Sequence, residues 1–159
     1  LNALAFVDEG GRSRMATRFA AGGIAPERLE LKYTRPQPAT WRAYRDVDIA
    51  LDPFPHNGGV TTFEALWMGA PTVSKRDRPP LGRYGDCLLS AVGLDDWCAD
   101  GVDAYVDRAV AAATDLDGLA RIRSQLRERM RGGPLCDGAG LARAMEDAFA
   151  QMRERIVSA

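Results

Sequence analysis

The sequence has few of the residues that build metal centres and disulfide frameworks. It contains one histidine, His56, and three cysteines, Cys87, Cys98 and Cys136, which are odd in number and far apart. A disulfide-stabilised small domain needs paired cysteines, and a structural zinc ion needs four ligands, mostly cysteine and histidine. The composition therefore argues against a disulfide framework and against a zinc site of the usual kind.

Long apolar runs and an excess of one charge are also missing. No stretch approaches the roughly 20 apolar residues of a membrane-spanning helix, and no basic segment precedes a signal-like apolar run. Lys and Arg total 21 against 22 Asp and Glu, which argues against a nucleic-acid partner. The 159 residues, 46% of them apolar, are typical of one globular domain with a core. We expect a cytoplasmic protein with no membrane and no nucleic-acid partner.

The chemistry is concentrated in residues 48–71, which begin with a strand and a glycine turn. Residues 47–51 form an apolar run with β-branched side chains, which predicts a buried strand, and Pro53 ends it. Gly58 and Gly59 follow in the turn, where they allow positive φ and a close approach of a ligand to the backbone.

A helix is expected directly after this turn, over residues 60–68, with Thr61 or Thr62 as its N-cap and Gly69 as its end. The first amides of a helix have no intrahelical partner and carry partial positive charge, so a phosphate binds there. Glu64, on the expected first turn, is placed to accept hydrogen bonds from a ribose diol. The alternative interpretation is a tight turn without a ligand; the threonines and the acid favour the phosphate site.

The run DIALDPFPHNGGVTTFEALWMGAPTV resembles the nucleotide-sugar-binding segment of the O-linked N-acetylglucosamine transferase family, in its bacterial SPINDLY-like branch. The likeness continues through Arg83 and the LLSAVGL run of residues 88–94, and more loosely back to about residue 29. It implies the C-terminal, donor-binding domain of a GT-B glycosyltransferase, with UDP held at the turn and the helix start. The donor-site positions that the resemblance implies are Thr40, His56, Asn57, Gly58, Gly59, Val60, Thr61, Thr62 and Glu64.

Two of these positions differ from the family pattern. Thr40 stands where the family has a histidine that stacks on uracil, and Val60 stands where a threonine commonly follows the turn. Trp41, beside Thr40, is interpreted as a core or lid residue, with base stacking as the alternative. A second hypothesis therefore stays open, in which the chain is a non-catalytic Rossmann-like binding or interaction module with an eroded nucleotide site.

A basic cluster follows the next expected strand, at residues 71–74. In parallel sheets ligands bind at the carboxyl ends of strands, so Lys75, Arg76 and Arg78 are candidates. We interpret them as a solvated surface, with the alternative that Lys75 or Arg78 contacts the donor phosphates. Arg83, which matches a family arginine, is a further candidate for the phosphates or for orienting this loop, and Asp86 has no assigned role.

The rest of the chain predicts alternating strands and helices. The further strands are expected over residues 1–7 and 29–33, and the further helices over residues 12–21, 39–45, 82–92, 102–113, 116–131 and 141–157, the last with an N-cap at Asp137. This alternation predicts a doubly wound, Rossmann-like parallel sheet flanked by helices, in a single domain over residues 1–159 whose part from 101 to 159 is helical. Because the first residues are typical of a strand inside a fold, we expect a fragment of a longer chain.

The resemblance implies an inverting glycosyltransferase that moves N-acetylglucosamine from UDP to a protein serine or threonine. No metal or other cofactor is expected, because the helix start and nearby cations neutralise the diphosphate. The acceptor site and most catalytic groups are expected upstream, so this chain alone is expected to be inactive. A dinucleotide-binding oxidoreductase is disfavoured, because DEGGR at residues 8–12 lacks the GxGxxG spacing.

Overall fold

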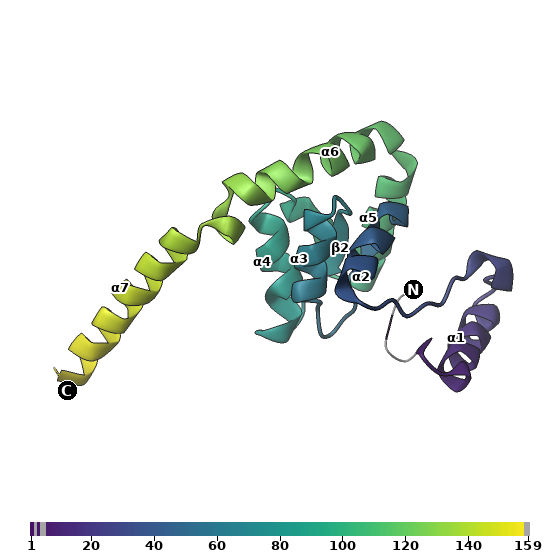
Figure 1. Cartoon of the computed structure of the whole chain (residues 1–159), viewed down its shortest axis with the longest axis horizontal. Coiled ribbons are helices and arrows are strands. Elements are labelled where there is room, and N and C mark those ends of the chain that lie inside the picture. Colours follow the sequence, from purple (N-terminus) through teal and green to yellow (C-terminus); the bar gives the residue numbers. More distant parts are fainter. Residues whose placement is uncertain (2, 4–5, 158–159) are drawn as a thin grey trace. The chain divides into compact units, whose positions relative to one another are not determined.

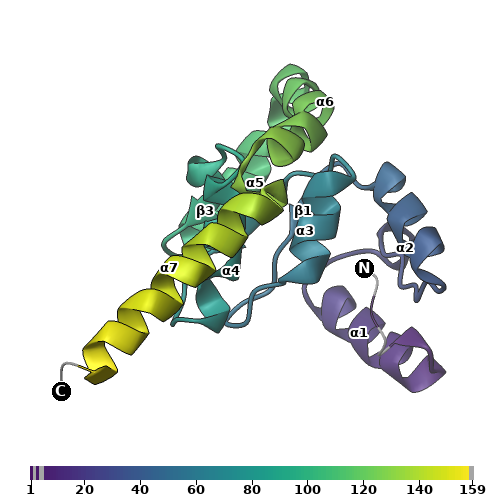
Figure 2. The same ribbon diagram turned by 60° about the vertical axis from the view of Figure 1, so that its left-hand side comes forward.

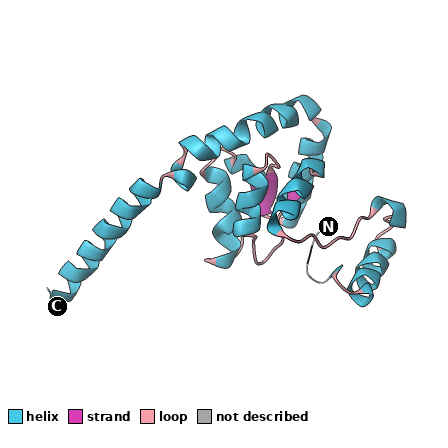
Figure 3. Cartoon of the chain, in the orientation of Figure 1, coloured by secondary structure: helices cyan, strands magenta, loops and turns pink. Residues whose placement is uncertain are grey.

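The computed structural model describes residues 1, 3 and 6–157 (Figure 1). The chain divides into two compact units, Leu1–Ala43 and Tyr44–Ala159. Most of the described residues are helical, and the strands are short (Figure 3).

The described residues of the first unit form the α-helices α1 (Glu9–Ala21) and α2 (Gln37–Ala43) and a 3-10 turn, η2 (Pro26–Arg28). Helix α1 starts earlier than predicted because Asp8 caps it, accepting from Gly11 N at 2.7 Å.

The strand predicted over residues 29–33 is reduced to one β-bridge at Lys32. Its backbone N donates to Leu1 O at 3.0 Å, and its O accepts from Ala3 N at 3.1 Å. The strand predicted over residues 1–7 includes residues 2, 4 and 5, which lie outside the described residues.

The second unit is an alternation of strands and helices. Its elements are η3 (Tyr44–Asp46), β1 (Ala50–Leu51), α3 (Val60–Trp67), β2 (Thr72–Lys75), η4 (Leu81–Arg83), α4 (Tyr84–Ser90), η5 (Asp95–Trp97), β3 (Cys98–Ala99), α5 (Val102–Thr114), α6 (Leu116–Gly132), η6 (Pro134–Cys136) and α7 (Gly138–Val157). The strands pair in the order β1-β2-β3, all parallel, with Ala50 opposite Thr72 and Ser74 opposite Cys98. The predicted parallel sheet flanked by helices is confirmed, with strands shorter than expected.

The core of this unit lies between the sheet and helices α3 to α6. Its fully buried members include Leu66 on α3, Val73 on β2, Leu89 on α4 and Leu126 on α6. Helix α6 packs against α3 and α5 (Figure 2).

Helix α3 ends in the Schellman arrangement, in which Gly69 has a φ of 82° and Ala70 N donates to Ala65 O at 2.8 Å. The predicted stop at Gly69 is confirmed, and the chain turns there into β2.

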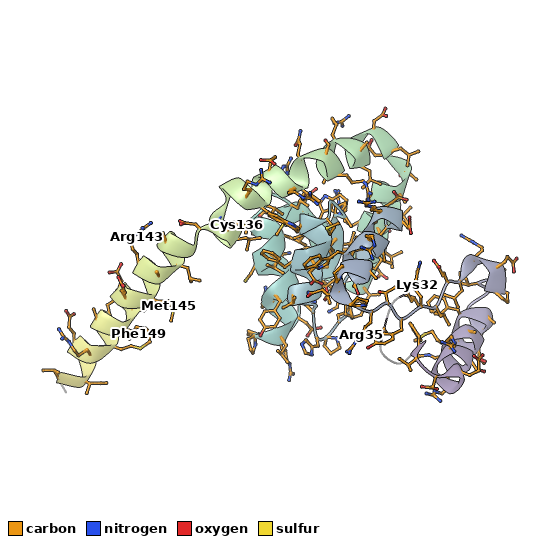
Figure 4. All side chains as sticks on the ribbon, in the orientation of Figure 1. Lys32, Arg35, Cys136, Arg143, Met145 and Phe149 are labelled. Atoms are coloured by element: carbon orange, nitrogen blue, oxygen red, sulfur yellow. The ribbon has the colours of Figure 1, made fainter. Side chains whose placement is uncertain are left out.

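Helix α7 buries none of its described residues. Its N-cap is the predicted one, because Asp137 accepts from Gly140 N at 2.8 Å. The large apolar side chains exposed on it are Leu141, Met145, Phe149, Met152, Ile156 and Val157, of which Figure 4 labels Met145 and Phe149. No helix among residues 6–157 is both long enough and apolar enough to cross a lipid bilayer.

Candidate functional site

The turn between β1 and α3 is anchored by Asp52, which follows β1 directly and is only 3% exposed. Its Oδ1 accepts from Gly58 N at 2.7 Å and from Thr62 Oγ1 at 3.3 Å. Its Oδ2 accepts from Ser74 Oγ at 2.6 Å. One carboxylate thus joins the turn to α3 on one side and to β2 on the other.

Burial raises the pKa of Asp52 above its ordinary value. The hydrogen bonds from Ser74, Gly58 and Thr62 oppose this shift, because they favour the ionised carboxylate. Desolvation outweighs them, so the folded protein holds the Asp52 proton more tightly than a solvated aspartate does.

Asn57 fixes the middle of the turn from inside. Its side chain is 2% exposed, and its Nδ2 donates to Pro53 O at 3.1 Å and to Lys75 O at 3.3 Å. Both amide protons are therefore taken by carbonyls of the protein. Its Oδ1 is buried and has no hydrogen-bond partner within the part of the chain that the structure describes.

Gly58 is required by lack of space rather than by its backbone conformation. A Cβ there would lie 2.6 Å from Thr62 Oγ1, 2.7 Å from Thr61 Oγ1 and 3.1 Å from Asp52 Oδ1. The turn does not use the positive φ that Gly58 and Gly59 allow, because the described glycines with positive φ are Gly23, Gly69 and Gly93. Gly59 itself has a φ of −100°.

The start of α3 has no side-chain cap. Gly59 is the N-cap residue, so the prediction that Thr61 or Thr62 caps the helix is wrong. The amides of residues 59–62 belong to the first turn, which by helix geometry offers them no intrahelical acceptor. Helix geometry makes them candidate donors for a phosphate, the ligand that the sequence predicts here.

The two threonines of the first turn differ in exposure. Thr61 is exposed, whereas Thr62 is 4% exposed and shares the buried face of α3 with Ala65 and Leu66. Glu64 lies in the second turn, not in the first as predicted, and is half-buried. His56 and Val60 are exposed.

Tyr44 closes one side of this helix start. Its hydroxyl donates to Thr61 O at 3.1 Å, and burial, with a contribution from the charge of Glu64, raises its pKa. A small pocket of about 110 Å³ lies here, lined by Tyr44, Asp52, Thr61, Thr62 and Thr72 among others. Tyr44 was not singled out from the sequence, where it was only part of an expected helix over residues 39–45.

The segment from Leu81 to Tyr84 lies along another side of the turn. Asn57 N donates to Leu81 O at 3.1 Å, and a Cβ on Gly59 would meet the Tyr84 ring at 3.8 Å. Arg83, the N-cap residue of α4, therefore lies close to the turn. Its side chain is 46% exposed, and its Nη1 lies 3.5 Å from Asp86 Oδ2.

The basic cluster of Lys75, Arg76 and Arg78 begins at the last residue of β2 and is mostly engaged in ion pairs. Lys75 Nζ lies 2.7 Å from Asp77 Oδ2 and 4.9 Å from the centre of the Phe54 ring, and its side chain is 13% exposed. Hydrogen bonding from Lys75 lowers the pKa of Asp77. The interpretation of Lys75 as solvated surface is therefore wrong, whereas Arg78 is exposed.

Arg76 is likewise a structural residue. Its Nε donates to Asp86 Oδ1 at 2.8 Å, and its Nη1 donates to Cys98 O at 2.7 Å and to Asp100 Oδ1 at 3.1 Å. Asp86, which had no assigned role in the sequence analysis, is thus an ion-pair partner of Arg76. Through Arg76, α4 is joined to the end of β2 and to Cys98 of β3.

Thr40 belongs to the first unit. Its hydroxyl donates to Thr34 O at 3.0 Å and accepts from Thr34 Oγ1 at 3.2 Å. Trp41, expected in a core or lid, is 41% exposed and so is not a core residue.

A larger hollow of about 470 Å³ lies elsewhere in the second unit, lined by Asp48, Leu116 and Arg123 among others. Arg123 already donates to the carbonyls of Val47 and Asp48, and the other lining residues are mostly apolar. Convergent polar groups lie instead at the start of α3. Among the described residues, no three or more His, Cys, Asp or Glu side chains gather as a metal site would require.

The family model described as glycosyl transferase family 41 matches residues 2–145. The chain belongs to glycosyl transferase family 41. The predicted resemblance is therefore confirmed, and so is its assignment to a glycosyltransferase family.

Relatives of this family-41 chain include a protein of Solanum lycopersicum named "Probable UDP-N-acetylglucosamine--peptide N-acetylglucosaminyltransferase SPINDLY". It is 36% identical over 145 residues, which are 91% of this chain and 16% of the relative. A Caenorhabditis elegans UDP-N-acetylglucosamine--peptide N-acetylglucosaminyltransferase is 29% identical over 136 residues, 86% of this chain and 12% of that protein.

The fold is shared with a solved structure, that of a mutant of the Thermobaculum terrenum O-GlcNAc transferase. The TM-score is 0.89 at 35% identity, over 96% of this chain and 29% of that one. The family-41 chain thus has the fold of a C-terminal GT-B domain, as predicted, and spans less than a third of each of these proteins.

Proposed function

We propose that this chain is the donor-binding half of an inverting glycosyltransferase that moves N-acetylglucosamine from UDP to a serine or threonine of a protein. Family membership and the names of the relatives support the donor and the protein acceptor. The observation that carries the proposal is the uncapped start of α3, where an exposed Thr61 hydroxyl lies beside the amides of residues 59–62.

The diphosphate binds at this helix start. The unpaired amides and the helix dipole attract its negative charge, and Thr61 Oγ1 adds a donor. Arg83 and Arg78 are the cations that we assign to it. Arg83 is 46% exposed and only 3.5 Å from Asp86, whereas Lys75 is 13% exposed and held by Asp77 at 2.7 Å. Asn57, Gly58 and Thr62 shape the turn from inside, and His56 and Val60 line its exposed side.

The ribose binds one turn further along α3. Glu64 is the acid there, half-buried and close enough to Tyr44 for its charge to raise the tyrosine pKa. Its carboxylate accepts the hydrogen bonds of the ribose hydroxyls. The resemblance assigns Thr40 to the position of the histidine that stacks on uracil, and a threonine has no ring for such stacking.

The chain stabilises the leaving group. The acceptor hydroxyl attacks C1 of the sugar, the bond from C1 to the diphosphate oxygen breaks, and UDP departs with the bonding electrons. The start of α3 stabilises the charge that develops on this oxygen, so no metal is required. The acceptor site and the base that takes the hydroxyl proton belong to the rest of the longer protein, and this chain alone is inactive. We further propose that residues 1–159 work as one Rossmann-like domain in the cytoplasm.

A calorimetric titration tests the donor site. The chain is titrated with UDP and with UDP-N-acetylglucosamine, and ADP is the control ligand. We expect binding selective for the uridine nucleotides and at least about tenfold weaker in Glu64→Ala, since a buried ribose hydroxyl without its acceptor costs about 1–3 kcal/mol. Absence of binding, or equal binding of ADP, contradicts the proposal and favours the non-catalytic module with an eroded site.

A further inference from the structure

The carboxylate of Asp52 joins three parts of the structure around the turn between β1 and α3. Its carboxylate accepts hydrogen bonds from the turn, from α3 and from β2, at Gly58 N, Thr62 Oγ1 and Ser74 Oγ. Its backbone carbonyl accepts from the hydroxyl of Tyr105 on α5 at 3.1 Å. Asp52 therefore joins the turn both to α3 and to the sheet, whereas Asn57 joins it to β2 through Lys75 O.

The chain leaves no spare room around the carboxylate. A Cβ at Gly58 would lie 3.1 Å from its Oδ1, and a Cβ at Gly85 would lie 2.7 Å from its Oδ2 and 1.9 Å from Ser74 Oγ. Glycine on both sides lets the backbone approach the carboxylate closely, so the side chain has one set of partners.

We propose that Asp52 is the positioning residue of the donor site, holding Gly58 N–H inward so that the amides of residues 59–62 remain free for the diphosphate. This inference rests on the proposed function. Asp52 acts through the turn and does not touch the donor, because its two oxygens are occupied by protein donors and its side chain is buried.

The role requires the acceptor oxygens of Asp52 and not its charge. A negative charge beneath an anion site opposes binding, so the carboxylate is useful there only as an acceptor. Asp52→Asn keeps an acceptor for Gly58 and Thr62, and the Ser74 hydroxyl can rotate to accept from the new amide. Asp52→Ala removes both acceptors and leaves the Gly58 amide without a partner.

The experiment measures UDP affinity by calorimetry and amide hydrogen exchange by NMR on the full 159-residue chain. We expect Asp52→Ala to bind UDP at least about tenfold more weakly, which corresponds to about 1.4 kcal/mol, and to lose exchange protection at Gly58. We expect Asp52→Asn to bind as tightly as the wild type or more tightly, with Gly58 still protected. Rescue by the neutral isostere separates positioning from electrostatics.

Asp115→Ala is the matched control. Asp115 is the N-cap of α6, and its Oδ1 accepts from Gly118 N at 2.9 Å, so this substitution also removes a carboxylate that accepts from a glycine amide, but outside the donor site. It should leave both UDP affinity and Gly58 protection unchanged. Should Asp52→Ala fail to fold, Ser74→Ala, which frees Oδ2 alone, replaces it, with an expected loss of about threefold to fivefold in affinity.

The outcomes separate this inference from the proposed function. If the wild type binds UDP and a folded Asp52→Ala or Ser74→Ala binds it equally well, the inference is overturned while the proposed function stands. If the wild type binds no uridine nucleotide, the proposed function fails. The inference then depends on exchange alone: loss of protection at Gly58 in Asp52→Ala, restored in Asp52→Asn, supports the anchoring of the turn, and unchanged protection overturns it.

Discussion

At Gly58 the chain has no room for a side chain, because three oxygen atoms lie within 3.1 Å of the place where a Cβ would stand. Gly58→Ala must therefore push the turn away from Asp52 and the two threonines. We expect a loss of about 1–3 kcal/mol in the free energy of unfolding, as is usual for overpacking, together with a loss of UDP binding. Urea denaturation and calorimetry measure the two effects.

Gly132→Ala is the control for this substitution. A Cβ at Gly132 meets nothing within 4 Å, and the residue ends the exposed face of α6. We expect equal or slightly higher stability, since alanine is favoured over glycine in a helix by roughly 0.5–1 kcal/mol, and unchanged UDP affinity. If Gly58→Ala had the same free energy of unfolding and the same UDP affinity as Gly132→Ala, the turn would not be packed as described.

The raised pKa of Asp52 predicts a pH dependence of stability. The folded state holds this proton more tightly than the unfolded state, whose aspartate has an ordinary pKa of about 3.9. The contribution of Asp52 to the free energy of unfolding is therefore largest at low pH and falls as pH rises from about 4 through the raised folded value.

Asp52→Asn has no such proton and serves as the reference. Urea denaturation of both proteins from about pH 3.5 to pH 7 should show the stability of the wild type falling relative to Asp52→Asn as pH rises. A difference that stays constant, or that moves the other way, would mean that the folded protein does not favour protonated Asp52.

Some of these residue roles could be read from the sequence and some could not. The helical spacing of residues 62, 65 and 66 already places Thr62 on the buried face of α3, so its inward direction was available from periodicity. The role of Asp52 was missed because an acid between a strand and a proline is typical of a solvated strand end. Its partner Ser74 lies 22 residues away on the neighbouring strand, and only the pairing of the strands brings the two together.

Among the helices, α6 and α7 differ in what they bury. Leu126 on α6 is 0% exposed in the core, whereas Met145 on α7 is 46% exposed. We expect Leu126→Ala to lower the free energy of unfolding by about 2–5 kcal/mol, from lost burial and the cavity left behind. Met145→Ala should change it by about 0.5 kcal/mol or less.

Urea denaturation of the two variants checks this contrast. Comparable losses from both substitutions would contradict the description of α7, because an exposed methionine has no core contacts to lose. A small loss from Leu126→Ala would instead contradict the packing of α6 against α3 and α5.

Elements with strong periodicity and clear stops were predicted well. The extents of α3, α5 and α6 follow the apolar spacing and, for α3, the glycine that ends it. The strands were overestimated: β1 covers two residues of the predicted 47–51, and residues 29–33 keep one bridge. A short apolar run fits a strand locally, but its pairing depends on neighbours that lie elsewhere in the chain.

At the scale of the whole molecule, the alternation of strands and helices was enough to predict a parallel sheet with helices around it, and the family match agrees. The ion pairs that hold the carboxyl end of the sheet were not predictable. Arg76 joins Asp86 and Asp100, which are 10 and 24 residues away, and a charge cluster in sequence does not reveal such partners. For this reason Lys75, Arg76 and Arg78 were interpreted as solvated surface, although Lys75 and Arg76 form ion pairs with Asp77 and Asp86.

Binding of the donor diphosphate at the start of α3 is tested most directly by an amide NMR titration of the isotopically labelled chain with UDP, with ADP as the control ligand. We expect the amide shifts caused by UDP to be largest at residues 58–64, with smaller changes around Arg83. Shifts centred on the hollow near Asp48 and Arg123, or no UDP-dependent shift at residues 58–64, would contradict it.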